Sequence, residues 1–297
     1  MRKVRGGREP DEALVAEFVR RYKVIGGSPL IDITRHQAAA LEDLLGWPVA
    51  AGMRFSEPTV EQALGELAAR GSRRVAGIVL SPQFSPLLMG GYGRAIADAR
   101  AALGPSAPEA PLAGAWHLEP ALVDGIAGRI RDGLARLDGG AAATAPVLLT
   151  AHSLPLRIAQ QEPGYLAQLE DTAIAIAQAA GLSRERWQFC WQSAGHEPGD
   201  WMRPDFADLM PELAAAGHRS VLVAPVQFLA DHLEVLYDID VGAREQAEAA
   251  GLRFSRIASL NDAPELISAL ASVARTTLRV PRRPVTNPAP LAPRGVA

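Results

Sequence analysis

The chain has 297 residues, of which 48% are hydrophobic and 21% charged, and this composition is typical of a globular protein long enough to form two domains with separate cores. Its net charge of -3 argues against a broad electrostatic attraction to nucleic acid or to an anionic membrane. Cys190 is the only cysteine, which excludes an intrachain disulfide, a four-cysteine zinc site and a cysteine-ligated iron-sulfur cluster within one chain.

The N-terminal segment is polar. The stretch "MRKVRGGREPDE" has no apolar core of a signal peptide, and no run approaches the roughly 20 apolar residues of a membrane span, so we expect a cytoplasmic protein. A doubly wound domain normally opens with a buried strand, whereas this sequence goes directly into a predicted helix at 11–24. We therefore expect the first half to lack a central or near-central strand.

Apolar runs of strand length alternate with longer segments of helical period along the chain. The predicted strands are 48–55, 74–82, 111–117, 146–153, 187–193 and 220–228. The predicted helices are 11–24, 31–45, 57–70, 86–103, 119–137, 163–181, 204–216, 231–250 and 263–278. Continuous apolar strands separated by helices indicate an α/β fold with parallel sheets covered on both faces.

Two similar halves are indicated by the order of these elements. The Gly/Ala-rich stretch "LDGGAAATAP" is typical of a linker, and "GIVLSPQFSPLL" before it is echoed by "VLVAPVQFLADHL" after it. The sequence predicts two doubly wound, Rossmann-like domains, 1–140 and 141–278, with a ligand cleft between them at the carboxyl ends of the strands. The Pro-rich tail, 279–297, is predicted to be disordered.

Polar residues follow the strands of the second half. "TAHSLP" places His152 directly after an apolar strand, and "APVQFLADHLE" brings Glu234 to the same edge of the sheet. A lone histidine is more often structural than catalytic, although the position of His152 at a strand end favours a function. An imidazole and a carboxylate together can bind a borderline divalent metal and accept protons. We expect His152 and Glu234 to form the centre of a site.

The stretch "FLADHLEVLYDID" carries further acids. If 231–239 is a helix, Asp231, Glu234 and Asp238 lie on one face. Such a stripe fits a solvated acidic face as well as a path for a hard cation, and the segment alone leaves both open. His232 points elsewhere on that helix, and we assign it a packing or supporting role.

Polar candidates also come from the first half, namely Arg5, Arg21, Tyr22 and Ser28. Two arginines near a crevice suit a ligand with carboxylates or phosphates, although an ordinary surface arginine is the commoner case. The sequence has no Walker loop and no G-x-G-x-x-G motif, so no motif supports nucleotide binding.

Four segments of the chain form a distinctive set, in the order "TAHSLP", "QSAGHEPGDWMRPD", "VAPVQFLADHLEVLYDID" and "SLNDAPELISALA". In order and spacing they resemble the matching segments of the ferrochelatases, the class II chelatases that insert ferrous iron into a porphyrin. The resemblance runs from about residue 5 to residue 278. "RYKVIGGSPLIDITRHQAAALE" is most similar to the bacterial branch that uses coproporphyrin III, which keeps all four propionates.

This resemblance implies roles for the candidate residues. His152 matches the family histidine that binds the incoming metal and accepts a pyrrole proton, and Glu234 matches the glutamate facing it across the porphyrin. Asp231 and Asp238 are similar to outer carboxylates that pass the metal or protons inward. The positions that hold porphyrin propionates are matched by Arg5, Arg21, Tyr22 and Ser28, with His117 standing where such enzymes often have a tyrosine.

The sequence departs from the family pattern in two places. Gln83 stands where several relatives carry a histidine. Family members also begin with an apolar strand, whose following turn carries an iron-ligating tyrosine in the coproporphyrin branch, and neither is present here. We expect that the start codon of this sequence has been placed too far downstream, which would explain why the strand and the tyrosine are missing.

The resemblance further implies porphyrin and Fe²⁺ as substrates, with no permanently bound cofactor and no iron-sulfur cluster. We expect a monomer that binds no nucleic acid and makes at most transient contact with a membrane or with other haem-pathway enzymes. The alternatives are a ferrochelatase for protoporphyrin IX, a cobalt or nickel chelatase for sirohydrochlorin, and a non-catalytic tetrapyrrole or metal carrier.

Overall fold

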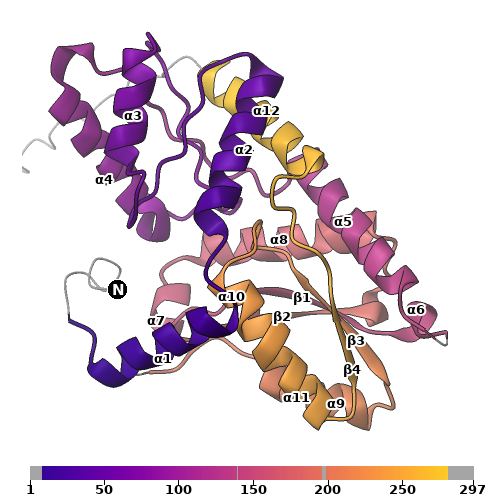
Figure 1. Ribbon diagram of the computed structural model, residues 1–297. Coiled ribbons are helices and arrows are strands. Elements are labelled where there is room, and N and C mark those ends of the chain that lie inside the picture. Colours follow the sequence, from indigo (N-terminus) through magenta and orange to yellow (C-terminus); the bar gives the residue numbers. More distant parts are fainter. Residues whose placement is uncertain (1–8, 139, 196–198, 280–297) are drawn as a thin grey trace, which may run out of the picture.

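The computed structural model describes residues 9–138, 140–195 and 199–279 (Figure 1). The α-helices there are α1 (Glu12–Val24), α2 (Leu30–Leu45), α3 (Val60–Ala69), α4 (Pro86–Leu103), α5 (Pro120–Ala135), α6 (Ala141–Thr144), α7 (Leu156–Ala159), α8 (Pro163–Ala179), α9 (Phe206–Ala215), α10 (Leu233–Leu236), α11 (Arg244–Ala249) and α12 (Pro264–Arg279). Short 3-10 helices lie at η1 (Gly104–Ser106) and η2 (Arg184–Arg186), and η3 (Asp238–Ala243) is a π-helix. None of the described helices is both long and apolar enough to span a bilayer.

The second half is built on a parallel sheet in the order β2-β1-β3-β4. Its strands are β1 (Val147–His152), β2 (Trp187–Gln192), β3 (Ser220–Pro225) and β4 (Arg253–Arg256). The first three were predicted within a few residues, whereas the short β4 was not predicted because only Phe254 in it is buried. The α/β prediction with a parallel sheet is therefore confirmed.

Helices cover both faces of this sheet (Figure 1). Leu149 and Leu222 face α5, α8 and α12, while Leu148 and Val223 face α9, η3 and α11. These strand side chains are fully buried, as expected for central strands of a parallel sheet. Because both faces are closed, the carboxyl edge of the sheet is where polar side chains can gather.

Helix starts follow local capping chemistry. Thr59 and Gln62 form a reciprocal capping box at the start of α3, and Asp205 and Asp208 do the same at α9. The Asp11 side chain accepts from the Leu14 N–H at 2.7 Å and so begins α1. These caps explain why most predicted helix boundaries agree with the structure within a few residues.

The first half differs from the prediction, because its described residues contain no regular strand. The predicted strand at 74–82 forms two isolated parallel bridges, Gly77 with Leu112 in the predicted strand at 111–117 and Arg74 with Glu109 just before it. The ladder is interrupted between these bridges at Pro111, which has no N–H to donate. The predicted strand at 48–55 pairs with neither segment in the described residues. The division into domains 1–140 and 141–278 stays a prediction.

The sequence predicts one helix at 231–250, and this prediction is wrong. Residues before Leu233 are not helical, and the segment is divided into α10, the π-helix η3 and α11. In η3 the Tyr237 carbonyl accepts from the Gly242 N–H at 3.0 Å, an i to i+5 bond that a regular α-helix lacks. The predicted tail, apart from Arg279, lies outside the described residues.

Candidate active site

The ends of β1 and β2 and the loop after β3 meet at the carboxyl edge of the sheet. His152 ends β1 and lies beside Gln192 at the end of β2. Gln192 is 1% exposed, and its amide donates to the backbone carbonyl of Glu234 at 3.3 Å. A buried glutamine thus holds the start of α10 against the end of β2, next to His152 on β1.

His152 and Glu234 face each other at this edge. His152 Nε2 lies 3.7 Å from Glu234 Oε1, and the two side chains are 31% and 38% exposed. His152 Nδ1 lies 2.5 Å from the Ser153 carbonyl oxygen, which can only accept, so Nδ1 carries a proton. In the neutral ring Nε2 then keeps a lone pair directed to the site, where it can bind a metal or take a proton.

His232 supports Glu234 from the other side. Its Nε2 lies 3.4 Å from Glu234 Oε2, and its Nδ1 donates to the Ala230 carbonyl at 2.8 Å. Burial opposes protonation of this ring, but the Glu234 carboxylate outweighs it and raises the pKa of His232. Both ring nitrogens face an oxygen acceptor, so a protonated His232 forms an imidazolium-carboxylate pair with Glu234.

The charge state of Glu234 follows from these neighbours. Burial alone raises a carboxyl pKa, yet the hydrogen bond from His232 and the charges of His152 and His232 lower the pKa of Glu234 below its ordinary value. Glu234 is therefore ionised near neutral pH, with one oxygen directed to each histidine. His152 Nε2 and Glu234 Oε1 are the two atoms at this edge that can coordinate a metal ion.

Asp238 lies at the start of η3 and is mostly buried. Its pKa is raised by burial, while a hydrogen bond from Ser193 and the guanidinium of Arg21 act in the opposite direction and Glu234 adds repulsion. Arg21 Nη1 lies 3.3 Å from Asp238 Oδ1, so α1 contacts the acidic segment directly. Asp238 is electrostatically coupled to both Glu234 and His152.

Asp231 belongs to a different network. Its carboxylate accepts from Ser259 Oγ at 2.7 Å and from Asn261 Nδ2 at 3.0 Å, and Arg256 Nη1 is 3.6 Å away. These contacts tie the loop after β3 to the loop after β4. Because residue 231 precedes α10, the predicted single helical face with Asp231, Glu234 and Asp238 is wrong.

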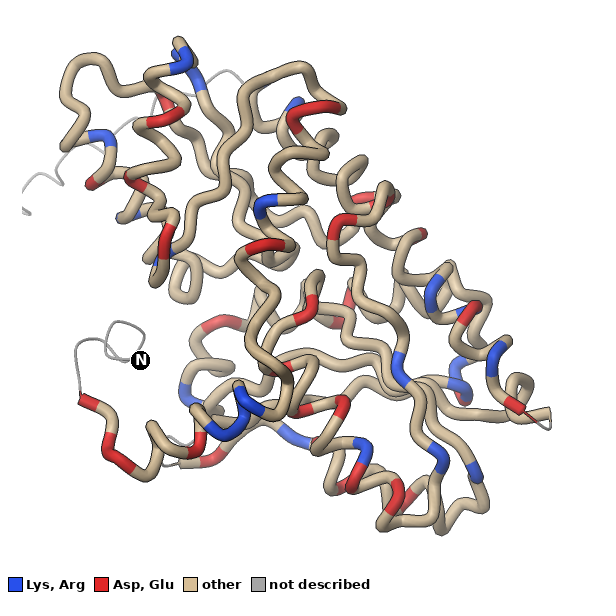
Figure 2. Tube along the Cα trace, in the orientation of Figure 1, with Lys and Arg blue, Asp and Glu red and all other residues tan. Residues whose placement is uncertain are grey.

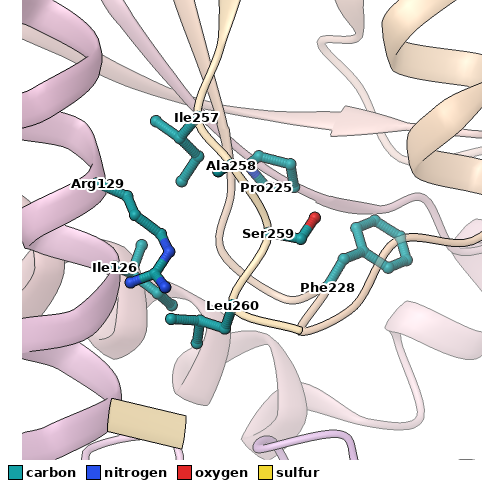
Figure 3. Close-up of a pocket in the computed structure, with 8 residues that line it drawn as sticks. All are labelled: Ile126, Arg129, Pro225, Phe228, Ile257, Ala258, Ser259 and Leu260. Carbon is teal, nitrogen blue, oxygen red and sulfur yellow. The ribbon is translucent and has the colours of Figure 1, made fainter. Parts of the chain in front are cut away.

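A small cavity lies behind this loop (Figure 3). Ser259 and Phe228 line it from the loops, and Arg129 and Ile126 line it from α5. Its volume is about 10 Å³, which leaves room for no more than one water molecule. It is too small to be a substrate site.

The ferrochelatase family model matches residues 13–278. The chain belongs to the ferrochelatase family. A ferrochelatase of Deinococcus radiodurans is 36% identical over 91% of this chain and 87% of its own length. The coproporphyrin III ferrochelatases of Anoxybacillus flavithermus and Geobacillus kaustophilus are 34% and 36% identical over 93% and 91% of this chain, and over 89% and 87% of their own lengths. The predictions of this family and of an enzyme are therefore confirmed.

Solved chelatase structures share the fold of this ferrochelatase-family chain. Bacillus subtilis SirB with Fe³⁺ superposes with a TM-score of 0.60 over 82% of this chain and 89% of that one, at 13% sequence identity. CbiX, described as the terminal enzyme of sirohaem biosynthesis in denitrifying bacteria, gives 0.52 over 84% and 94% at 16% identity. At these identities the likeness concerns the fold.

The predicted porphyrin-binding residues are dispersed in this ferrochelatase-family structure. Arg21 and Tyr22 lie on α1, where Tyr22 is 41% exposed, and Ser28 lies in the turn before α2. His117 lies before α5, and burial lowers its pKa so that it is neutral near pH 7. Neither ring nitrogen of His117 has a hydrogen-bond partner among the described residues. Arg5 lies outside the described residues.

Gln83, at the predicted departure from the family pattern, lies in the interior. It is fully buried, and its amide donates to Thr172 on α8 at 3.0 Å. Gln83 therefore links the first half to α8.

Two residues that support His152, Gln227 and Tyr165, were not predicted from the sequence. Gln227 accepts from the backbone N–H of His152 at 2.7 Å and donates to the Tyr165 hydroxyl. Tyr165 is 2% exposed, and burial raises its pKa to about 12, so it stays neutral. A glutamine just past an apolar strand was the available signal, but its contact with β1 depends on the tertiary fold.

Proposed function

We propose that this ferrochelatase-family enzyme inserts Fe²⁺ into coproporphyrin III and releases the two pyrrole protons. The observation that carries the proposal is the 3.7 Å approach of His152 Nε2 to Glu234 Oε1 at the carboxyl edge of the sheet. Iron insertion requires a metal ligand that can release the ion and bases close to the pyrrole nitrogens. An imidazole lone pair and an ionised carboxylate supply both.

In this proposal His152 receives the iron and accepts a pyrrole proton, and Glu234 acts beside it on the same face of the ring. The 3.7 Å between His152 Nε2 and Glu234 Oε1 leaves no room for a porphyrin between the two side chains, so the implied position of Glu234 across the ring from His152 is not the one proposed. His232 keeps Glu234 ionised through its hydrogen bond and charge. Asp238, whose pKa is raised, is suited to pass protons away from Glu234 because it can hold a proton closer to neutral pH. Asp231 is engaged by Ser259 and Asn261, and we assign it an anchoring role in place of metal transfer.

Porphyrin propionates would meet cationic and hydroxyl groups of the first half. Arg21 is shared between Glu17 at 2.8 Å and Asp238 at 3.3 Å, so a propionate at Arg21 would compete with these carboxylates. Tyr22 and Ser28 offer hydroxyls close to Arg21 in sequence. The coproporphyrin preference is supported by the relatives that carry this substrate in their names.

Turnover assays test this proposal. Anaerobic reactions with Fe²⁺ and coproporphyrin III, protoporphyrin IX or sirohydrochlorin should give the highest kcat/KM for coproporphyrin III. His152→Ala should lower kcat by at least about 100-fold, because it removes both the ligand and the proton acceptor. His218→Ala is the matched control, since His218 lies in the turn before β3, at the other end of that strand. Activity on sirohydrochlorin alone, or undiminished turnover in His152→Ala, would contradict the proposal.

A further inference from the structure

Segment 231–240 carries acids of the candidate site but has little regular structure of its own. Its backbone is extended at His232, continues as the four-residue α10 and ends in the first residues of the π-helix η3. A single helical turn is not stable by itself, and π-helices are rare. The positions of Glu234 and Asp238 must therefore be fixed by contacts with other elements.

Apolar contacts hold the inner side of this segment. Val235 and Ile239 are fully buried in the cluster that covers one face of the sheet. Burial of apolar side chains fixes how deep the segment lies, but it is non-directional and does not by itself set the position of the segment along the edge of the sheet. That position requires hydrogen bonds with a defined direction.

Arg256, the last residue of β4, supplies such bonds at the carboxyl end of the segment. Its Nε donates to Asp240 Oδ1 at 2.7 Å, and its Nη2 donates to Asp240 Oδ2 at 2.9 Å. Two parallel bonds between a guanidinium and a carboxylate fix both their distance and their orientation. The Arg256 side chain is 13% exposed, so little water competes for these bonds. Asp240 is thereby fixed two residues after Asp238.

The same guanidinium also reaches the amino end of the segment. Nη1 of Arg256 donates to Ser259 Oγ at 3.3 Å and lies 3.6 Å from Asp231 Oδ1. Ser259 Oγ donates to that carboxylate oxygen at 2.7 Å. The side chain of Asn261 accepts from the Asp231 N–H at 2.8 Å and donates to the Asp231 carboxylate at 3.0 Å. One arginine thus contacts both ends of segment 231–240.

We propose that Arg256 is a positioning residue, which fixes Glu234 and Asp238 at the site by holding both ends of the segment that carries them. Its role in iron insertion rests on the proposed function, whereas the hold on the segment does not. A lysine at this position would keep the positive charge, but its single ammonium group cannot form the two-bond fork with one carboxylate and reach the other as well. Geometry, more than charge, is therefore the property on which turnover should depend.

Arg256→Lys separates position from binding. Its kcat for iron insertion should fall at least about tenfold, because a misplacement of about 1 Å can cost about 100-fold in rate. The Kd of coproporphyrin III, measured by fluorescence quenching, should stay within about twofold of the wild-type value, which also shows that the variant is folded. The assay uses whichever of the three tetrapyrroles the wild-type chain metallates fastest.

Arg253→Lys is the matched control for this variant. Arg253 lies at the other end of β4, and its Nε donates to Ser220 Oγ at 3.2 Å, away from segment 231–240. Its replacement should leave kcat unchanged. Wild-type kcat in Arg256→Lys, or an equal loss of kcat in both variants, would overturn the proposal.

A second variant, Asp240→Asn, tests whether Arg256 acts through Asp240. It should also lower kcat, and the double variant of Arg256→Lys and Asp240→Asn should be no slower than Arg256→Lys alone, because both changes break the same contact. Losses of kcat that multiply in the double variant would mean that the two residues act separately, and they would overturn the proposal.

Hydrogen exchange of the porphyrin-free protein tests the hold on the segment without turnover. The N–H groups of Val241 and Gly242 donate to the Tyr237 carbonyl at 3.1 and 3.0 Å. Both amides should exchange at least about tenfold faster in Arg256→Lys, because η3 opens more often once Asp240 is released. Unchanged exchange in Arg256→Lys would overturn the proposal. Faster exchange in a protein that inserts no iron into coproporphyrin III would support the hold and contradict only the proposed function.

Discussion

At the scale of residues, the site depends on the protonation states of three side chains, Glu234 and the two histidines beside it, His152 and His232. Glu234 is ionised because His232 and His152 outweigh the effect of burial on its pKa, and Glu234 in turn raises the pKa of His232 against the effect of burial. The raised pKa of His232 means that its contribution to stability is fully present below about pH 6.5, its value in the unfolded chain, and is lost as the pH rises through the folded value. The lowered pKa of Glu234 means that its contribution is lost only at acidic pH.

His232→Leu should move the acid limb of the kcat/KM profile to higher pH. Without the His232 hydrogen bond and charge, burial raises the pKa of Glu234, so the carboxylate is protonated earlier as the pH falls. Initial rates between pH 5 and pH 9 measure the shift, and His36→Leu, whose ring is 70% exposed, is the control. An unchanged acid limb in His232→Leu would show that His232 does not govern the ionisation of Glu234.

At the scale of elements, α1 is attached by its polar residues. It has no buried residue, and it contacts Tyr237, the residue before η3, through the guanidinium groups of Arg20 and Arg21, which lie 5.4 and 5.0 Å from the centre of the Tyr237 ring. Arg20 also donates to the Tyr237 hydroxyl. Figure 2 shows acidic residues at the start of α1 and basic residues at its end, close to the segment that carries Asp238. The helix is thus held over the candidate site by contacts that an incoming carboxylate can exchange.

Arg21→Ala should loosen α1 without unfolding the rest of the molecule. The partly buried ion pair with Asp238 and the cation-π contact with Tyr237 are together worth about 1 kcal/mol, so α1 amides should exchange roughly fivefold faster. Hydrogen exchange of the porphyrin-free protein measures this, with Lys23→Ala on the same helix as control. Equal exchange in the two variants would mean that other contacts hold α1.

At the scale of the whole molecule, the two halves differ in packing. Leu222 in β3 is fully buried in a dense cluster, and a Cβ added at Gly133 would meet its side chain at 3.0 Å. Leu64 in α3 is only 5% exposed, yet it lines a cavity of about 890 Å³. Equally low exposure therefore does not imply equal stabilisation in the two halves, since the unfolding free energy lost on truncating a side chain depends on how many neighbours that side chain touches.

Leu222→Ala should cost about 2–5 kcal/mol of unfolding free energy, because it opens a new cavity in a packed core. Leu64→Ala should cost less than about 2 kcal/mol, because the space beside it is already open. Urea unfolding of both variants, with m-values compared, provides the measurement. A Leu64→Ala loss as large as that of Leu222→Ala would indicate that the first half is packed as densely as the second.

Local sequence patterns determined the α/β class, three of the four strands of the sheet, most helix boundaries and the pairing of His152 with Glu234. These features depend on apolar runs, capping residues and the rule that parallel strands end at one edge, all of which act over short stretches. The resemblance of "TAHSLP" and "VAPVQFLADHLEVLYDID" to one family added the proposed chemistry.

The tertiary structure alone decided which acids belong to the site. Asp231 and Asp238 are equivalent in a helical pattern, but Ser259 and Asn261 donate to the first. The second, at the start of the π-helix η3, contacts Arg21 and interacts electrostatically with His152 and Glu234. The contact of Gln227 with His152 likewise joins residues distant in the chain. Such contacts form only when whole elements pack, so no periodicity or local motif encodes them.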